Sequence, residues 1–273
     1  MPMDSTGARL SCALAIGGLD PGGGAGLAAD LRAFAAAGVF GCAAAAVMTI
    51  QSTAGLKSVE IVAARDLTAQ VAEVLRHQRV RAVKVGALGS EANVRALVRV
   101  LARHRDVPVV VDTPMLPTRG RTRLLAARAV AVLKGELLAR ATLVTVNIAE
   151  AQALLGERVR TVGEAHDAAR ALVGIGARAV LVKGGHMVGP AAIDVLALGG
   201  EVIELRASRL ALPPVHGTGC TLASLVAGRI ARRAGVGLDR LELVTAIRWA
   251  KRVHHMALAR AVDVGRGMRV LVF

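Results

Sequence analysis

The chain has 273 residues, of which 54% are hydrophobic and 20% are charged, a balance that allows a full buried core and excludes an intrinsically disordered chain. The formal net charge is +15, but the arginines stand one or two at a time along predicted helices, as on solvated helix faces. With no Tyr, one Trp and three Phe, the chain lacks aromatic platforms for single-stranded nucleic acid, so we expect no nucleic-acid partner.

The N-terminal half of the chain alternates between short apolar runs and amphipathic stretches. The apolar runs predict strands at residues 12–17, 41–48, 59–62, 81–85 and 107–111. Apolar residues at helical spacing predict helices at residues 28–37, 66–77 and 91–104. The glycine-rich segment 18–26 connects the first strand to the first helix.

The C-terminal half continues this alternation and then changes it. Strands are predicted at residues 143–146 and 179–182, and helices at residues 124–138, 149–155 and 164–175. Gly199 and Gly200 separate two runs, 191–198 and 201–206, as the turn of a β-hairpin would. Two final helices are predicted at residues 221–234 and 239–259.

This element order predicts an α/β fold with a mostly parallel central sheet flanked by helices on both faces. The sequence shows no repeat, no low-complexity linker and no break in composition, so we expect one domain over residues 1–273. The polar loop at residues 117–123 carries three arginines that would suit a lid over phosphates, although an exposed basic turn would have the same composition.

The three cysteines, Cys12, Cys42 and Cys220, lie far apart and form neither a disulfide framework nor a CxxC metal pair. The apolar stretch 10–16 is too short for a convincing signal sequence and is better explained as a first strand. No apolar run approaches the length of a membrane span. We therefore expect a cytoplasmic protein without a membrane partner.

Several polar residues and one glycine fall at or just past the carboxyl end of a predicted strand: Asp20, Gly86, Asp112, Asn147 and Lys183. Ligands of open α/β sheets bind at that edge. The chain has neither the Gly-x-x-x-x-Gly-Lys-[Ser/Thr] pattern nor the Gly-x-Gly-x-x-Gly pattern, so phosphate has to be held in another way.

The segment His216-Gly-Thr-Gly-Cys220, directly before a predicted helix, supplies such a phosphate site. Gly217 and Gly219 allow close backbone approach, and the start of a helix directs unpaired N–H groups and a positive dipole end to one point. A tight loop before a helix would use the same glycines. Cys220 lies in the first turn, where the helix field favours a thiolate, so we expect a lowered pKa.

This segment resembles the anion hole of the ribokinase-like superfamily, in the version found in hydroxymethylpyrimidine/phosphomethylpyrimidine kinases, where a cysteine stands in place of the aspartate base of the sugar kinases. Further blocks resemble that family in the same order: GLDPGGGAG at 18–26, TIQST at 49–53, KVG at 84–86, DTPM at 112–115, NIAEA at 147–151 and KGGH at 183–186. The resemblance extends from about residue 13 to about residue 259.

The resemblance implies an ATP-dependent kinase that phosphorylates 4-amino-5-hydroxymethyl-2-methylpyrimidine and then its monophosphate, giving the diphosphate used in thiamine synthesis. Phosphoryl transfer depends mainly on positioning and charge neutralisation. Backbone N–H groups of Gly217, Thr218, Gly219 and Cys220 would hold the transferred phosphoryl group. The Cys220 side chain would accept the proton of the substrate hydroxyl.

Other matching positions imply the remaining site residues. Gly18, Asp20 and Gln51 would bind the pyrimidine, because a carboxylate and an amide complement its donor and acceptor edge. Lys183, Asn147 and Asp112 would bind the nucleotide.

Asn147 and Glu150 match an N-x-x-E block that helps to position Mg²⁺ with its waters. A first-turn helix carboxylate would explain Glu150 equally. The expected cofactors are ATP and Mg²⁺, and similarity alone suggests a homodimer.

Three segments depart from the family pattern. Ala87 stands where the family has a methionine, Pro114 is shifted by one position, and the C-terminal end lacks the usual Pro and His. The first two changes reshape the pocket and leave a pyridoxal or pyridoxine kinase as an alternative, with Asp20 and Gln51 favouring the pyrimidine. A non-catalytic pyrimidine- or nucleotide-binding protein is a second alternative. Adjacent His254 and His255 point in different directions, so we expect them, and His186, not to bind a metal.

Overall fold

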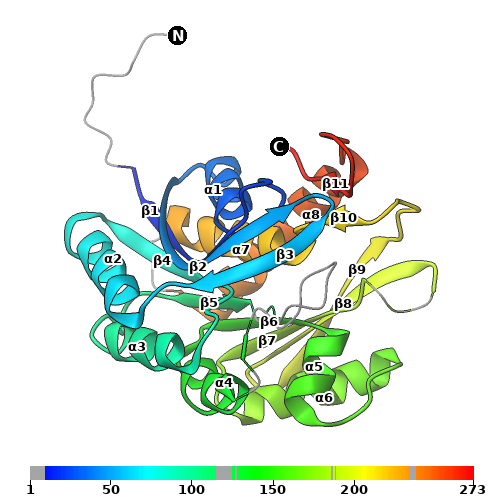
Figure 1. Cartoon of the computed structure of the whole chain (residues 1–273). Helices are drawn as coiled ribbons and strands as arrows, with labels where there is room; N and C mark the ends of the chain where they lie inside the picture. The colour runs from blue at the N-terminus through cyan, green and yellow to red at the C-terminus, as the bar shows by residue number, and fades with distance from the viewer. Residues whose placement is uncertain are drawn as a thin grey trace.

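A sheet of nine strands runs through the described part of the molecule in the order β3-β2-β1-β4-β5-β6-β7-β8-β9 (Figure 1). The computed structural model describes residues 10–112, 114, 125–126, 128–185, 187, 189–233 and 238–273. The loop predicted at 117–123 and His186 lie outside these residues.

The centre of the sheet is parallel and its two edges are antiparallel. The parallel strands are β1 (Cys12–Leu19), β2 (Phe40–Ser52), β4 (Val80–Val85), β5 (Val109–Asp112), β6 (Leu143–Asn147) and β7 (Ala179–Lys183). At one edge β3 (Gly55–Ile61) pairs with β2, and at the other β8 (Ala191–Leu198) and β9 (Glu201–Ser208) form the predicted hairpin beside β7. The mostly parallel sheet is confirmed.

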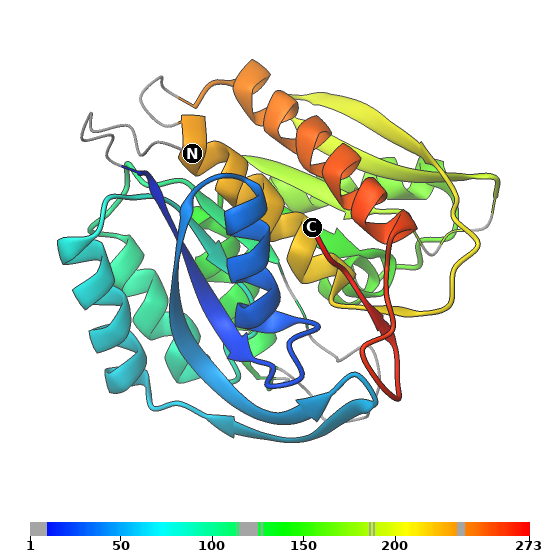
Figure 2. The ribbon, with the colours of Figure 1, turned by 90° about the horizontal axis from the view of Figure 1, so that it is seen from above.

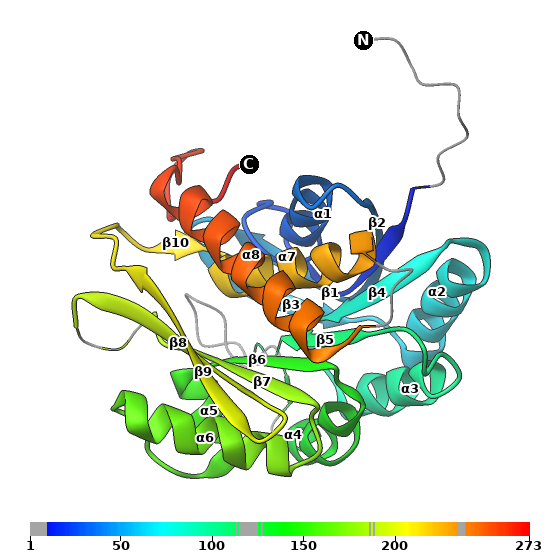
Figure 3. The same cartoon turned by 180° about the vertical axis from the view of Figure 1, so that it is seen from behind.

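Helices cover both faces of the sheet (Figures 2 and 3). One face packs against α2 (Ala64–His77), α3 (Glu91–Leu101), α4 (Ala129–Val132), α5 (Ile148–Leu155) and α6 (Val162–Gly174). The other packs against α1 (Gly26–Ala36), α7 (Thr218–Arg233) and α8 (Arg240–Ala259). None of the helices in the described ranges is both long and apolar enough to cross a bilayer.

The alternation of strand side chains divides the core into two clusters. In β1, Leu14 and Ile16 belong to the cluster under α2 to α6, while Ala13 and Ala15 belong to the cluster under α1, α7 and α8. The small alanines leave room for α7 to lie close to the sheet.

The same alternation places charged side chains beneath α7. Ala82, Val110 and Leu181 belong to the cluster on the α7 side. Two residues further along each strand, on the same face, stand Lys84, Asp112 and Lys183. The charged residues of β4, β5 and β7 therefore lie on the face of the sheet that α7 covers.

The predicted and observed elements differ in several places. The helix expected at 124–138 is, in its described part, α4 followed by the π-helical turn η1 (Leu133–Leu137) and the 3-10 turn η2 (Leu138–Arg140), with helix-weakening Gly135 inside η1. Strand β3 is longer than predicted because its exposed edge carries polar side chains that hide the apolar pattern.

Strand β2 continues to Ser52, beyond the predicted end at residue 48, so Gln51 lies within it. Strands β10 (Val215–His216) and β11 (Arg269–Val270) form a separate two-stranded sheet too short to predict.

Candidate active site

One pocket of about 690 Å³ opens at the carboxyl edge of the parallel strands, a size suited to small-molecule ligands. The predicted site residues all line it: Gly18, Asp20, Gln51, Asp112, Asn147, Glu150, Lys183, Gly217, Thr218, Gly219 and Cys220. Gly86 lines it as well. The strand-end residues share one edge because parallel strands point the same way, and their predicted roles remain predictions.

The turn before α7 is held against the glycine-rich loop. Gly217 has a φ of +73°, which favours glycine, and a Cβ at this position would overlap the backbone carbonyl of Gly24. The first α-helical hydrogen bond runs from Thr221 N–H to the Gly217 carbonyl, at 3.0 Å. The N–H groups of Thr218, Gly219 and Cys220 precede that bond and face the pocket end of the helix.

The expectation of a lowered pKa at Cys220 is wrong. Burial raises the pKa of the thiol to about 12, and the carboxylates of Asp112 and Asp30 add to the increase. Lys84 and the backbone of Gly26 act in the opposite direction without outweighing them. The loss of hydration therefore dominates the protonation of this thiol.

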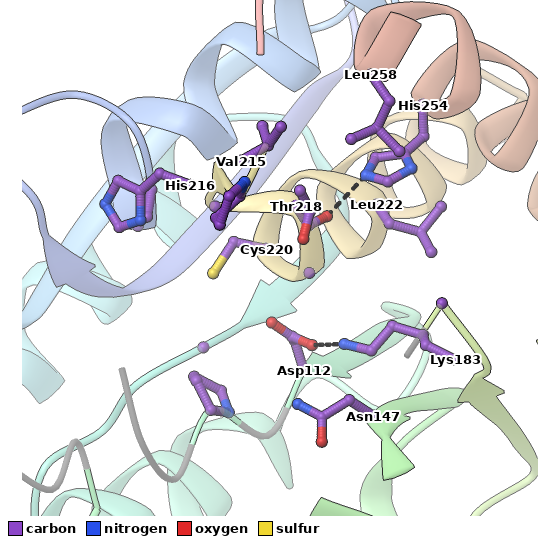
Figure 4. A pocket seen from close by; sticks show the side chains of 18 of the residues that line it. Asp112, Asn147, Lys183, Val215, His216, Thr218, Cys220, Leu222, His254 and Leu258 are labelled. Carbon is purple, nitrogen blue, oxygen red and sulfur yellow. Dashed lines mark hydrogen bonds and ion pairs between the residues drawn. The ribbon is translucent and has the colours of Figure 1, made fainter. Parts of the chain in front are cut away.

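Lys183 and Asp112 form an ion pair below Gly219. Lys183 Nζ lies 2.8 Å from Asp112 Oδ1 (Figure 4). Thr145 donates a hydrogen bond of 2.9 Å to the same oxygen. Burial would lower the pKa of Lys183, but Asp112 and Glu150 outweigh it and raise the pKa. A Cβ on Gly219 would lie 3.1 Å from Lys183 Nζ, so the glycine lets this cation approach the helix start.

Asn147 and Glu150 form a capping box at the start of α5. Asn147 Oδ1 accepts from Glu150 N–H and Glu150 Oε2 accepts from Asn147 N–H, both at 2.8 Å. Glu150 is therefore a first-turn helix carboxylate that caps α5, as one of the two explanations from the sequence predicted. Burial raises the pKa of Glu150 to about 7. The charge of Lys183 and the hydrogen bond from Asn147 N–H lower this pKa and the charge of Asp112 raises it, but burial has the largest effect.

The carboxylates of Asp112 and Glu150 suit a metal ion that arrives bound to a substrate. The described residues include no group of three or more His, Cys, Asp or Glu side chains able to hold a metal by themselves. Asp112 Oδ2 and Glu150 Oε1 are carboxylate oxygens beyond the hydrogen bonds just described, and both residues line the pocket. Mg²⁺ usually takes one or two carboxylates together with phosphates and water, so these residues fit it.

Asp20 is engaged on both carboxylate oxygens. Oδ1 accepts from Gly22 N–H at 2.8 Å, and Oδ2 accepts from Ala25 N–H at 2.9 Å and lies 2.8 Å from His216 Nε2. Burial would raise the pKa of Asp20, but His216 and the two backbone donors outweigh it and lower the pKa. Asp20 is thus a carboxylate that fixes the glycine-rich loop to His216.

Gln51 contacts the same histidine from the neighbouring strand β2. Its Nε2 lies 3.1 Å from His216 Nε2, so Asp20, His216 and Gln51 form one polar cluster. We call this side of the pocket the acceptor end, after the role that the sequence predicts for Asp20 and Gln51. In the view of Figure 4, Cys220 lies between His216 on one side and Lys183 and His254 on the other. We call the latter side, with Asn147, the nucleotide end, after the role that the sequence predicts for Lys183 and Asn147.

Sequence reasoning did not assign roles to His216, His254 and Lys84. His254 Nε2 lies 2.9 Å from the Thr218 carbonyl and braces the first turn of α7 from α8 (Figure 4). Burial lowers the pKa of His254 to about 4, so it is neutral and donates to that carbonyl. His216 could have been found from the sequence, because it is the first residue of the segment His216-Gly-Thr-Gly-Cys220. His254 could not, because no local pattern indicates that it contacts Thr218, 36 residues away in the chain.

Comparison with known proteins identifies relatives of the whole chain. The family model described as phosphomethylpyrimidine kinase matches residues 20–271. A hydroxymethylpyrimidine/phosphomethylpyrimidine kinase of Rhizobium meliloti (strain 1021) is 39% identical over 260 residues, which cover 93% of this chain and 94% of that protein.

Solved structures share the fold. A Bacillus subtilis pyridoxal kinase in complex with ADP is similar with a TM-score of 0.85 and 26% identity, covering 96% of this chain and 97% of that one. A phosphomethylpyrimidine kinase of Clostridium difficile 630 has a TM-score of 0.76 and 28% identity, covering 90% and 99%. The α/β architecture is therefore of the ribokinase-like type.

Proposed function

The chain belongs to the phosphomethylpyrimidine kinase family, and on that premise we propose that it transfers the γ-phosphoryl group of ATP to 4-amino-5-hydroxymethyl-2-methylpyrimidine and then to its monophosphate, for thiamine synthesis. The observation that carries the proposal is the pocket in which the start of α7, with Cys220, stands between an acceptor end and a nucleotide end. We further propose that residues 1–273 act as one domain.

At the acceptor end, the ring would meet Gln51, with Gly18 and the cluster around Asp20 forming the adjoining wall. An amide presents both a donor and an acceptor, which suits the amino group and ring nitrogen of an aminopyrimidine. Asp20 contributes by holding His216 and the glycine-rich loop, since its oxygens already accept from three donors. Ala87 beside this wall leaves more room than the methionine of the family pattern.

At the start of α7, the N–H groups of Gly217, Thr218, Gly219 and Cys220 would stabilise the charge on the migrating phosphoryl group. Only the thiolate form of Cys220, the minor form while its pKa is about 12, would take the proton of the substrate hydroxyl as the new O–P bond forms and the bond from the γ-phosphorus to ADP breaks. Lys84 favours the thiolate at Cys220, and it is the charged side chain that most lowers the pKa of this thiol. The transition state is loose, so positioning contributes more than the strength of the base.

At the nucleotide end, Lys183 would neutralise phosphate charge and Asn147 would donate its side-chain amide. Leu222 and Leu258 line the pocket near His254 and offer apolar contact to a base. Asp112 and Glu150 would hold Mg²⁺, which supplies charge neutralisation between the phosphates when bound.

Release of ADP, measured by a coupled assay with each acceptor, tests this function. We expect turnover with the hydroxymethylpyrimidine and with its monophosphate, each dependent on ATP. Turnover of pyridoxal alone would overturn the pyrimidine assignment in favour of the pyridoxal kinase alternative. Binding of the pyrimidine by calorimetry without any ATP consumption would overturn catalysis and favour the binding-protein alternative.

We also propose a cytoplasmic homodimer. Apolar side chains are exposed at the β2–β3 edge of the sheet, where Met48, Ile50 and Ile61 are 40%, 64% and 46% exposed. A second copy of the chain would cover this edge and remove its apolar surface from water. Sedimentation equilibrium tests the proposal, and a monomer at micromolar concentration would refute it.

A further inference from the structure

The chain after α8 returns to the acceptor end of the pocket. We call residues 266–271 the C-terminal strap; in Figure 2 the red chain after α8 runs toward the β2–β3 turn and then reverses, so that the strap leads back from this turn to the C-terminus. Its strand β11 pairs in parallel with β10, placing Arg269 beside Val215 and Val270 beside His216. Val270 also exchanges two backbone hydrogen bonds with Val262, at 2.9 and 3.1 Å. The strap is therefore tied to the strand that carries His216.

The strap is tied to the end of β2 by two further hydrogen bonds. Met268 N–H donates to the Thr53 carbonyl at 2.9 Å, and Thr53 Oγ1 donates to the Arg266 carbonyl at 3.1 Å. Thr53 stands two residues after Gln51 and is 7% exposed. These bonds fix the position of Gln51 relative to His216.

A third contact joins the strap to the glycine-rich loop. A Cβ on Gly24 would lie 3.1 Å from Val270 Cγ1, so the Val270 side chain packs directly on this glycine. Met268, Val270 and Leu271 are 3%, 6% and 3% exposed, which makes the strap part of the folded core. The strap thus touches the segments that carry Asp20, Gln51 and His216.

We propose that the C-terminal strap positions the acceptor end of the pocket, holding the walls that carry Asp20, Gln51 and His216 at the spacing that the acceptor substrate requires. The identity of that acceptor rests on the proposed function. In the described part of the chain, the hydrogen bonds of the strap go to Thr53, Val262 and β10, and none goes to Asn147, Lys183 or His254. The strap therefore acts on the acceptor and not on ATP.

Two glycines of this region provide a matched pair of variants. Gly265 has a φ of +149° and Gly267 a φ of +142°, so an alanine at either position meets similar backbone strain. A Cβ on Gly265 would have no atom within 4 Å, whereas a Cβ on Gly267 would lie 2.7 Å from Ala54 N and against the Thr53 backbone. Only Gly267→Ala pushes the strap away from β2.

Steady-state kinetics of the full-length enzyme separate the two substrates. We expect Gly267→Ala to raise KM for the pyrimidine at least tenfold while KM for ATP changes less than twofold, and Gly265→Ala to leave the ratio of the two KM values unchanged. Equal changes in both KM values, or no difference between the two variants, would overturn the proposal. Val270→Ala, which keeps the backbone and removes the contact with Gly24, is expected to act in the same direction if Gly267→Ala fails to fold.

Hydrogen exchange of the same variants without substrate tests the strap independently of the reaction. We expect faster deuterium uptake in peptides covering residues 49–54 and 213–220 for Gly267→Ala than for Gly265→Ala. Identical deuterium uptake in the two variants would overturn the positioning role proposed for the C-terminal strap. A wild-type enzyme that does not phosphorylate the pyrimidine would refute the proposed function, and the exchange comparison would still decide the role of the strap.

Discussion

Lys84 Nζ lies 3.0 Å from both carboxylate oxygens of Asp30, and the two side chains, from β4 and α1, are 1% and 0% exposed. Ser224, one turn after Cys220 on α7, donates a hydrogen bond of 2.7 Å to Asp30 Oδ1. Burial alone would lower the pKa of Lys84, but Asp30, Cys220 and Asp112 outweigh it and raise the pKa. The buried pair therefore joins the sheet and α1 to the helix that carries the cysteine.

Lys84→Met is expected to lower the free energy of unfolding by about 3–5 kcal/mol, because Asp30 then stays buried without its cation. Urea denaturation measures this change. The double variant Lys84→Met/Asp30→Asn removes both charges and is expected to recover part of the loss, while the amide oxygen at position 30 can still accept a hydrogen bond from Ser224. A double variant less stable than Lys84→Met alone would contradict the explanation by charge.

Cys220→Ala is expected to lower kcat by about 10²–10⁴-fold, the usual contribution of a general base, with little change in KM for ATP. The coupled ADP assay measures both constants. Cys42→Ala, in the core away from the pocket, serves as the control and should retain turnover. Unchanged kcat in Cys220→Ala would remove the role assigned to the sulfur and leave the backbone anion site intact.

The raised pKa of Cys220, about 12 in the ligand-free enzyme, predicts a thiol at neutral pH. Since the thiolate is the reactive form, alkylation by iodoacetamide should rise about tenfold per pH unit from pH 7 upward, without a plateau below pH 10. Mass spectrometry of the peptide containing Cys220 separates this reaction from that of the two buried cysteines. A plateau near pH 8 would show a thiolate at ordinary pH and contradict the effect of burial.

Gly219→Val is expected to lower kcat/KM by at least about 10²-fold, because the added side chain enters the space between the start of α7 and Lys183, where phosphate would bind. Gly135→Ala is the control, since a Cβ there would have no neighbour within 4 Å. Kinetics together with thermal unfolding distinguish a lost anion site from a lost fold. Wild-type kinetics in a folded Gly219→Val enzyme would refute the backbone cradle.

Glu150 should make the enzyme less stable as pH rises. Its pKa is raised from 4.5 to about 7, so the folded state binds the proton more tightly than the unfolded state. The stabilisation is complete below pH 4.5 and is lost as pH rises through 7, by up to about 3 kcal/mol. Glu150→Gln keeps a capping residue and should flatten this dependence in urea titrations at pH 5 and pH 8. An equal change in the free energy of unfolding between pH 5 and pH 8 in the wild type and in Glu150→Gln would contradict the raised pKa of Glu150.

The sequence predicted the shared edge of the site because of one simple geometric rule. Apolar runs identified the parallel strands, and parallel strands bring their carboxyl ends to one side of a sheet, so Asp112, Asn147 and Lys183 were expected to meet. The hydrogen bond between His254 and Thr218, and the pairing of β10 with β11, were not predicted. They depend on how α8 and the C-terminal segment pack in three dimensions, which no local pattern encodes.

The sequence by itself determined the alternating elements, the glycine turn before α7 and the chemical groups available to the pocket, because each follows from hydrogen bonding and side-chain spacing within a few neighbouring residues. Only the tertiary structure decided the protonation of Cys220, the raised pKa of Glu150 and the engagement of Asp20 by His216. A pKa depends on every charge and every lost water around a group, and folding brings those from β4, β5 and α1 to the cysteine.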